Sequence, residues 1–299
     1  MSETEKKIKR KIIRNVFLIA IIIEVVVSPL RGYVNTQSAS VAAFVIFFAY
    51  ITFILTKNGQ KVKPVNLLIA ALLGASVLQL PMRIINFQST LGTLLDFLFH
   101  LLAICMAYCF YKSKKTIRLI IIAVSVAMCV FIYFKGYPMW RHNLNHGTFL
   151  GNVEKTYIDN IEFQTSEGDT LLLSSFKGKY LVLDCWYTYC GVCYRKFPEV
   201  QAFYDTYRDN SDIVFYALHS RMENRENETI EKGSHILKEH GYTFPCLSID
   251  IDNPVLKELG VDGYPTVIIF DRESNLIFRG GIENVTRFVD KLINKQIKE

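Results

Sequence analysis

The chain has 299 residues, of which 51% are hydrophobic, and its mean hydropathy is +0.21. This composition excludes an ordinary one-domain soluble protein, and the length favours about two domains. Residues 1–140 hold 16 Lys and Arg against 4 Asp and Glu, whereas residues 141–299 hold 18 against 24. The net charge of +6 therefore describes a basic apolar half joined to a mildly acidic half, so we expect no nucleic-acid partner.

Apolar segments occupy the first half of the chain. Each is long enough, or nearly so, to cross a hydrocarbon core of about 30 Å as a helix. So many apolar segments could not all be buried in one small soluble domain, and we therefore expect residues 1–135 to form a helical bundle of about five helices in a lipid bilayer. The segments are Ile12–Leu30, Ser38–Thr56, Val65–Leu80, Leu91–Tyr111 and Leu119–Phe134.

Basic residues between the apolar segments predict the orientation of this bundle. Six lie between Lys6 and Arg14 at the N-terminus, three lie in the second connecting loop and four in the fourth, but only one lies in each of the first and third loops. The N-terminus is thus predicted to be cytoplasmic, with everything after Phe134 outside the cytoplasm. A cleaved signal peptide ending near Ser38–Ser40 is an alternative interpretation of the first segment, and it leaves the C-terminal half on the same side.

Ionisable residues within the predicted spans are candidates for function. Asp96 and His100 are four residues apart on one helix face, and Glu24 could pair with them. Cys105 and Cys109 face another way on the same helix.

Residues 136–152 are predicted to form a polar juxtamembrane linker. Its Tyr137 and Trp140 suit a membrane interface. Its His142 and His146 have the spacing of helical metal ligands, but no third ligand is near in the sequence, so we expect them to be solvated.

From about residue 153 the pattern becomes that of an α/β domain, which extends to residue 299. Strands that alternate with helices predict a sheet with crossover connections, with a final hairpin as an antiparallel edge. The expected elements are a hairpin (Phe163–Leu173), a buried strand (Tyr180–Cys185), a helix to about Tyr207, a strand (Asp212–Leu218), a helix (Thr229–His240), a strand (Phe244–Ile249), a short helix (Asn253–Leu259), the hairpin in YPTVIIFDRESNLIFRGG and a closing helix (Glu283–Lys295).

The first buried strand leads into WYTYCGVCYRKFP, where Cys190 and Cys193 are separated by two residues. Such a pair can be a redox couple, half of a metal site or two inert thiols. Structural zinc requires four Cys or His ligands, usually as two paired motifs, and no second CxxC is present in the sequence. We therefore expect no metal. Cys185 and Cys246 are expected to be small core residues, although they could pair if the fold brought them together.

The run GKYLVLDCWYTYCGVCYRKFP, followed some 70 residues later by GVDGYPTVIIF, resembles thioredoxin-fold proteins. Within them, residues 155–299 are most similar to the TlpA/ResA-like group of membrane-tethered thiol–disulfide oxidoreductases, which are related to cytochrome c maturation. Three positions depart from that group. Tyr189 stands where Trp is usual, Val192 where Pro is common, and Asp184 matches the buried acid of cytosolic thioredoxins where the tethered group more often has Asn.

The resemblance assigns roles to individual residues. Cys190, exposed at a helix N-terminus that stabilises its thiolate, would attack a substrate disulfide, and the shielded Cys193 would resolve the mixed disulfide. Buried Asp184 would act as the base for Cys193. Pro265 would be a cis proline facing the pair, and Tyr264 and Tyr189 would bind an extended substrate segment. No cofactor is implied.

Function is therefore expected to be disulfide reduction in extracytoplasmic proteins, with a membrane or periplasmic electron donor as a second partner, although the redox direction stays open. One alternative is an oxidase that passes electrons to quinone through the membrane half. The topology is similar to that of quinone-linked oxidases related to vitamin K epoxide reductase, but the CxxxC of Cys105 and Cys109 is not their CxxC, and the first outer loop has no cysteine. The sequence also leaves open a non-catalytic binding module and, more weakly, a peroxidase.

Overall fold

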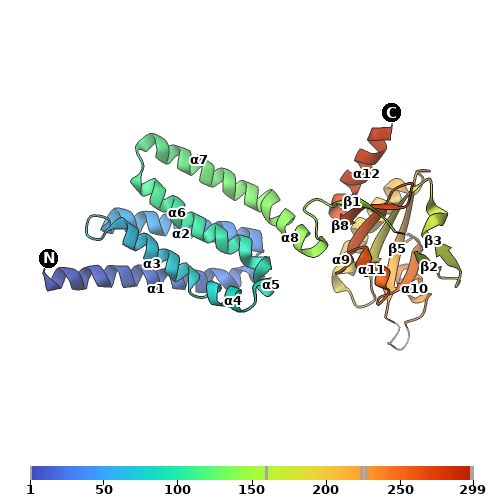
Figure 1. The fold of residues 1–299 in the computed structure, drawn as a ribbon, viewed down its shortest axis with the longest axis horizontal. Coiled ribbons are helices and arrows are strands. Elements are labelled where there is room, and N and C mark those ends of the chain that lie inside the picture. Colours follow the sequence, from blue (N-terminus) through green and yellow to red (C-terminus); the bar gives the residue numbers. More distant parts are fainter. Residues whose placement is uncertain (1, 159–160, 223–224, 226–227, 297–299) are drawn as a thin grey trace. The chain divides into compact units, whose positions relative to one another are not determined.

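The computed structural model describes residues 2–158, 161–222, 225 and 228–296. The chain divides into two compact units, Met1–Arg141 and His142–Glu299 (Figure 1). The first unit is helical and the second is built on one sheet, which agrees with the expected fold class.

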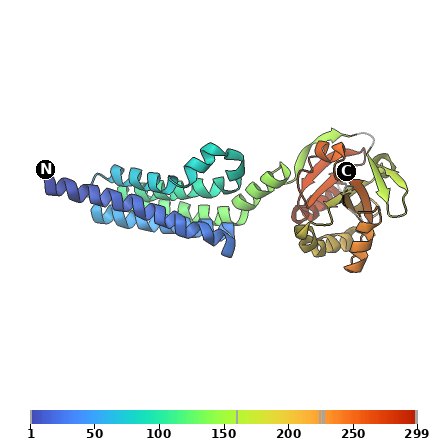
Figure 2. The ribbon, with the colours of Figure 1, turned by 90° about the horizontal axis from the view of Figure 1, so that it is seen from below.

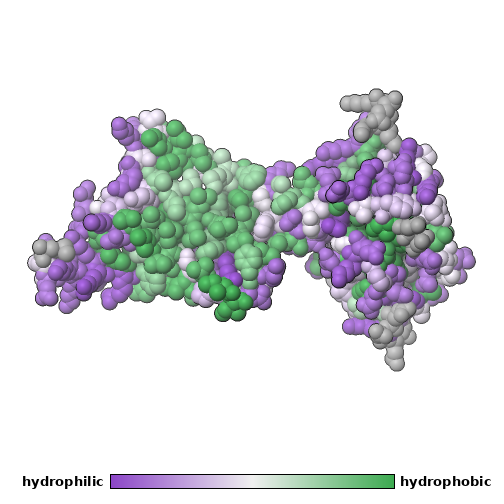
Figure 3. All heavy atoms as spheres, viewed as in Figure 1, coloured by the Kyte–Doolittle hydropathy of each residue, from purple (hydrophilic) through white to green (hydrophobic). Residues whose placement is uncertain are grey.

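The N-terminal unit is a bundle whose long helices run side by side (Figures 1 and 2). The face seen in Figure 3 carries a broad band of apolar side chains, as expected of a surface that faces lipid. Among the described residues, four helices are long and apolar enough to cross a membrane, or five if one bent pair is a single span. The elements are α1 (Glu3–Tyr33), α2 (Thr36–Asn58), α3 (Pro64–Ser76), α4 (Gln79–Ile85), α5 (Phe87–Thr90), α6 (Leu94–Lys112), α7 (Lys115–Phe131), a π-helical turn (Ile132–Gly136) and α8 (Tyr137–His146).

The third expected span is the bent pair. Helices α3 and α4 meet at 53°. Pro81 lies in the first turn of α4, and a proline ring clashes with the carbonyl four residues earlier, here that of Val77. The helix therefore breaks at Val77–Leu78, within the segment that the sequence predicts to be continuous.

The ionisable residues of the bundle form one buried cluster, which confirms the expected pairing. His100 Nδ1 lies 2.7 Å from Glu24 Oε1, and His100 Nε2 lies 3.1 Å from Asp96 Oδ1. Asp96 also contacts Arg31 of α1 and Ser40 of α2. Buried charges need such partners, so this cluster joins α1, α2 and α6. The Cys105 and Cys109 side chains are exposed on another face of α6, as expected.

The C-terminal unit has an eight-stranded mixed sheet of order β1-β8-β7-β4-β5-β6-β2-β3. Strand β4 pairs parallel with β5 and antiparallel with β7. The elements are β1 (Asn152–Tyr157), β2 (Glu162–Thr165), β3 (Thr170–Leu172), a 3-10 turn (Leu173–Phe176), β4 (Tyr180–Trp186), α9 (Gly191–Tyr207), β5 (Ile213–Arg221), α10 (Lys232–Glu239), β6 (Cys246–Asp250), α11 (Pro254–Glu258), β7 (Thr266–Phe270), β8 (Asn275–Gly280) and α12 (Ile282–Gln296).

Two parts of the sequence interpretation are corrected. The final hairpin is not the edge of the sheet, because β1 pairs with β8 beyond it. The sequence did not indicate β1, whose residues are mostly exposed and polar. Residues 136–152, expected as a polar linker, contain helix α8.

Apolar side chains pack on both faces of the sheet. One face carries a core with α9, α10 and α12, and the other carries a core with α11 and the β2–β3 hairpin. Because side chains alternate along a strand, β4 contributes Val182, Asp184 and Trp186 to the α9 face and Leu181, Leu183 and Cys185 to the opposite face.

Asp96→Leu should destabilise the bundle, because it leaves Arg31 and the Glu24–His100 pair without the central carboxylate. Removal of one partner of a buried ion pair costs about 3–5 kcal/mol, which corresponds to a fall of roughly 6–20 °C in unfolding midpoint. Thermal unfolding of the detergent-solubilised chain measures this fall. Cys105→Ala, at an exposed position of the same helix, is the control and should leave the midpoint unchanged. An Asp96→Leu chain with the parental midpoint would contradict the expectation.

Candidate active site

Cys190 lies where strand β4 passes into helix α9. All of β4 beyond Tyr180 is buried, and a tight turn closed by the Cys190 N–H and the Tyr187 carbonyl (3.0 Å) follows it. Cys190 is the N-cap of α9, and its Sγ accepts the Cys193 N–H at 3.1 Å. Free N–H groups at a helix N-terminus favour negative charge, so this position favours a thiolate on Cys190.

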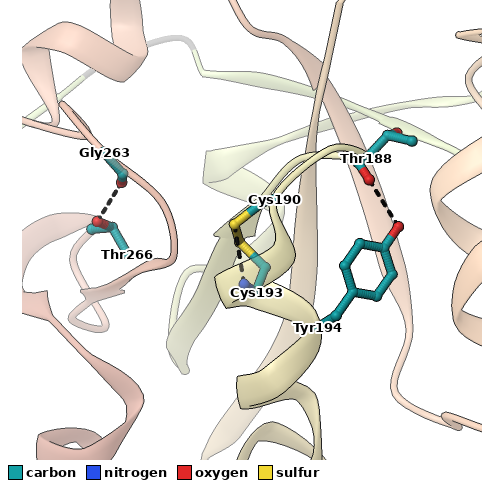
Figure 4. Close-up of a disulfide and its surroundings, with 6 residues drawn as sticks. All are labelled: Thr188, Cys190, Cys193, Tyr194, Gly263 and Thr266. Atoms are coloured by element: carbon teal, nitrogen blue, oxygen red, sulfur yellow. Dashed lines mark hydrogen bonds between the residues drawn. A yellow bond between two sulfur atoms is a disulfide. The ribbon is translucent and has the colours of Figure 1, made fainter. Parts of the chain in front are cut away.

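Cys190 and Cys193 form a disulfide with a Cα–Cα distance of 5.2 Å (Figure 4). Cys193 is fully buried, as expected. Cys190 is only 4% exposed, so the expectation of an exposed thiol is wrong for this state. Both cysteines belong to the core on the α9 face, against which the partly buried Tyr187 and Tyr264 pack. Their rings lie 5.1 Å apart.

Asp184 is buried on the face of the sheet against which α9 packs. It is 1% exposed, and its Oδ1 has no hydrogen-bond partner among the described residues. Burial raises the pKa of this carboxyl from 3.8 to about 8. A group that titrates near neutral pH can accept and return a proton under physiological conditions, which is the property that a general base requires.

The loop before β7 carries the other expected site residues. The Tyr264–Pro265 bond is cis. Tyr264 is partly buried, and burial raises its pKa to about 12, so its phenol stays neutral. The Thr266 hydroxyl donates to the Gly263 carbonyl at 2.7 Å and closes this loop (Figure 4). Directly before Cys190 in the chain, the half-exposed Tyr189 ring lies 4.3 Å from the Arg225 guanidinium, which stacks over it.

His142 and His146 are buried, so the expectation that they are solvated is wrong. The Gly281 N–H points at His142 Nε2 (3.3 Å), and His142 Nδ1 lies 2.6 Å from the Thr148 carbonyl. His146 Nδ1 lies 3.1 Å from the Thr266 hydroxyl. Both rings thus bind the protein, and in the described part of the chain no group of three His, Cys, Asp or Glu side chains is placed to hold a metal ion.

Cys185 and Cys246 remain free thiols. Cys185 belongs to the core on the α11 face, whereas Cys246 packs against the core on the α9 face. The sheet therefore separates them, and they cannot pair without its rearrangement.

Sequence reasoning did not identify a cluster of three polar residues, one of which lies in this turn. Thr188, His219 and Glu228 are in contact, although 31 and 40 residues separate Thr188 from the other two. The one available signal was the histidine that directly follows the apolar run of strand β5.

Comparison with known proteins finds relatives of the C-terminal unit. Residues 156–279 match the AhpC/TSA family. The thiol-disulfide oxidoreductase ResA of Bacillus thuringiensis subsp. konkukian is 25% identical over 166 residues, which cover 56% of this chain and 87% of that protein. ResA of Bacillus anthracis is 22% identical over 188 residues, or 63% of this chain and 92% of that protein. These relatives confirm the resemblance read from the sequence.

Solved structures include similar folds. The thioredoxin domain of a thiol-disulfide oxidoreductase from Bacteroides vulgatus is 21% identical, with 47% of this chain and 98% of that chain covered and a TM-score of 0.39. A thiol:disulfide interchange protein from Bacteroides sp. is 20% identical, with 48% and 91% covered and a TM-score of 0.41.

Asp184→Asn should stabilise the C-terminal unit increasingly as pH rises. The folded-state pKa of about 8 lies above the ordinary value, so the folded protein holds this proton more tightly and loses stability between about pH 4 and pH 8. The variant escapes this loss, and its advantage should grow from near zero at pH 4 to on the order of 5 kcal/mol at pH 8. Unfolding followed by Trp186 fluorescence, in a Trp140→Phe chain, measures it. An equal advantage at pH 5 and pH 8 would contradict a raised pKa.

Proposed function

Because residues 156–279 form a thioredoxin-fold domain of the AhpC/TSA family that is homologous to ResA, we propose that the chain is a membrane-anchored thiol–disulfide oxidoreductase that reduces disulfides of extracytoplasmic proteins. The observation that carries the proposal is the position of Cys190 as the N-cap of α9, with the fully buried Cys193 one turn further along. In the reduced state, the Cys190 sulfur at the start of the helix would meet the substrate while the Cys193 sulfur stays shielded.

In the proposed reaction, the Cys190 thiolate attacks one sulfur of the substrate disulfide. A mixed disulfide forms, and the other substrate sulfur leaves as a thiolate that takes up a proton. Cys193 then loses its proton to the Asp184 carboxylate and attacks the Cys190 sulfur. The second substrate sulfur leaves and receives a proton, and the Cys190–Cys193 disulfide remains. Two electrons have passed to the substrate.

The presence of Asp184 favours the proposal that the cysteine pair reduces substrate disulfides. Cys193 lies in a fully buried place where a thiol resists ionisation, so the resolving step needs a nearby base. The Asp184 carboxyl, whose pKa is about 8, can act as this base because near neutral pH it can take up the proton and release it again. Its position on the α9 face of β4 is consistent with this role.

Substrate binding is assigned to both sides of Cys190. The backbone of Tyr264 would pair with an extended segment of the substrate. Pro265 has no N–H that could compete for the carbonyls of that segment. Tyr189 would contact the substrate on the α9 side, with half of its side chain exposed. Family analogy suggests apocytochromes c as one class of substrate.

The N-terminal bundle would anchor this domain to the bacterial inner membrane and receive a separate electron donor. A reductase in an oxidising compartment must be recharged after each cycle. The charge pattern of the loops supports a cytoplasmic N-terminus and an extracytoplasmic C-terminal unit. Cys105, Cys109 and Cys129 are free thiols, and nothing in their positions favours an internal relay to quinone.

Cysteine labelling tests the orientation. Tyr33 is 85% exposed in the first predicted outer loop, and Ser113 lies in a predicted cytoplasmic loop. In intact cells a membrane-impermeant maleimide should label Tyr33→Cys and not Ser113→Cys, in a chain whose other exposed cysteines are replaced by serine. Permeabilised cells provide the control, in which both positions should react. The opposite pattern would overturn the proposed localisation.

Redox state tests the function. In growing cells Cys190 and Cys193 should be mostly reduced, as measured by acid quench and the gel shift of a maleimide polymer. The Cys190→Ser/Cys193→Ser chain controls for the other five thiols. Cys193→Ser should accumulate mixed disulfides with substrates, whereas Cys190→Ser should not, since only Cys190 attacks.

A mostly oxidised pair in cells with intact reducing pathways would overturn the proposed direction and favour an oxidase coupled to quinone. Full activity of the Cys190→Ser chain in cells would favour a non-catalytic binding module. Both results are distinct from a failure to express, because the gel shift reports the amount of chain directly.

A further inference from the structure

A buried polar cluster includes Thr188, which lies in the turn that ends in Cys190. Thr188 Oγ1 is 3.0 Å from His219 Nε2 and 3.3 Å from Glu228 Oε2. The other carboxylate oxygen of Glu228 lies 3.7 Å from Lys232 Nζ. The side chains of His219 and Glu228 are 0% and 1% exposed. Burial of a carboxylate and an imidazole is costly unless they are hydrogen-bonded, so the contact with Thr188 matters to the stability of the cluster.

One protonation pattern satisfies these contacts. Burial lowers the pKa of His219 to about 4, so its ring is neutral. With the proton on Nε2, His219 donates to Thr188 Oγ1, and the Thr188 hydroxyl donates to the Glu228 carboxylate. His219 Nδ1 then carries no proton, which suits its lack of a hydrogen-bond partner among the described residues. The chain of donors thus runs in one direction, from His219 through Thr188 to Glu228.

The His219 ring has little freedom to turn away. It lies 4.8 Å from the Trp186 ring on one side. On the other side Gly233 of α10 approaches so closely that a Cβ there would lie 2.8 Å from the Cβ of His219. The strand, the tryptophan and the helix together hold the donor in place.

Thr188 is also held by its backbone. Its carbonyl accepts the hydroxyl of Tyr194 at 2.9 Å, and Tyr194 directly follows Cys193 in α9 (Figure 4). Thr188 and Tyr189 are the two inner residues of the turn that the Cys190 N–H closes on Tyr187. The position of Thr188 therefore determines where Cys190 stands at the start of α9.

We propose that Thr188, His219 and Glu228 form a positioning triad that holds the Cys190 sulfur against the N–H groups at the start of α9, and so sets the reactivity of Cys190. Those N–H groups stabilise a thiolate only at short range, since the effect is confined to the first turn. When the turn is loosened, the thiolate should become less stable and the pKa of Cys190 should rise. The reduced state loses that stabilisation, and the reduction potential of the pair should fall. The inference rests on the proposed function, because it concerns the same cysteine.

Threonine 188 allows a test without a change of charge. Glu228 also bears a negative charge that by itself disfavours a thiolate, so its removal has two opposing effects. Thr188→Val removes the hydroxyl and keeps the shape, whereas Thr188→Ser keeps the hydroxyl. Thr206→Val is the matched control, since the exposed Thr206 hydroxyl donates to the Ala202 carbonyl of its own helix α9.

The measurement is the pH dependence of Cys190 alkylation by iodoacetamide, on the reduced full-length chain in detergent. Tandem mass spectrometry of the tryptic peptide Tyr180–Arg195 separates Cys190 from its neighbours. Thr188→Val should raise the pKa of Cys190 by about 0.5–1 unit, and thus slow alkylation roughly 3–10-fold at low pH. Thr188→Ser and Thr206→Val should match the parent chain.

His219→Phe provides a second, independent variant, because it removes the donor and keeps a neutral ring. It should shift the pKa of Cys190 in the same direction, and the double variant with Thr188→Val should shift it no further than Thr188→Val alone. A parental titration of Thr188→Val, an equal shift in Thr188→Ser or additive shifts in the double variant would overturn the triad. This titration needs no substrate, so it can succeed even where redox state in cells or mixed-disulfide trapping contradicts the proposed function.

Discussion

The chemistry of the chain depends on how strand β4 ends. This strand is paired on both sides, parallel to β5 and antiparallel to β7, and its buried side chains fix its register. The turn that follows delivers Cys190 to the start of α9. The same pairing sets Thr266 opposite Cys185, so the loop that carries Pro265 lies beside the end of β4. The hydrogen bonds that build the sheet therefore also assemble the proposed site.

Alternation along β4 gives neighbouring residues different environments. Asp184 faces α9 and has a carboxyl that titrates near neutral pH, whereas Cys185 faces the opposite core and is an inert thiol. Burial raises the pKa of Cys185 well above its ordinary value, which removes it from thiolate chemistry near neutral pH. A shift of register by one residue would exchange the two side chains, so the proposed base depends on the same constraint as Cys190.

The sequence predicted those elements whose signals are local. The continuous apolar run of β4 and the CxxC predicted the junction, and the apolar segments predicted the bundle. The cis proline was expected from the resemblance to thioredoxin-fold proteins, which the YPT motif helps to carry. Strand β1 was missed because its exposed residues have no apolar alternation. The bend between α3 and α4 had a signal in Pro81. The burial of His142 and the contact of Thr188 with Glu228 had none, because they join residues far apart in the chain.

Both units contain a buried histidine in contact with a carboxylate. The effect of each pair depends on which elements of the fold it connects. In the bundle, Glu24, Asp96 and His100 come from two of the long helices, so their pairing favours one packing arrangement of those helices. In the C-terminal unit, His219 and Glu228 meet on the hydroxyl of a turn residue two positions before Cys190. A polar contact between rigid elements specifies a fold. The same contact made to a turn can set the position of a reactive atom, because a turn has few other interactions that fix it.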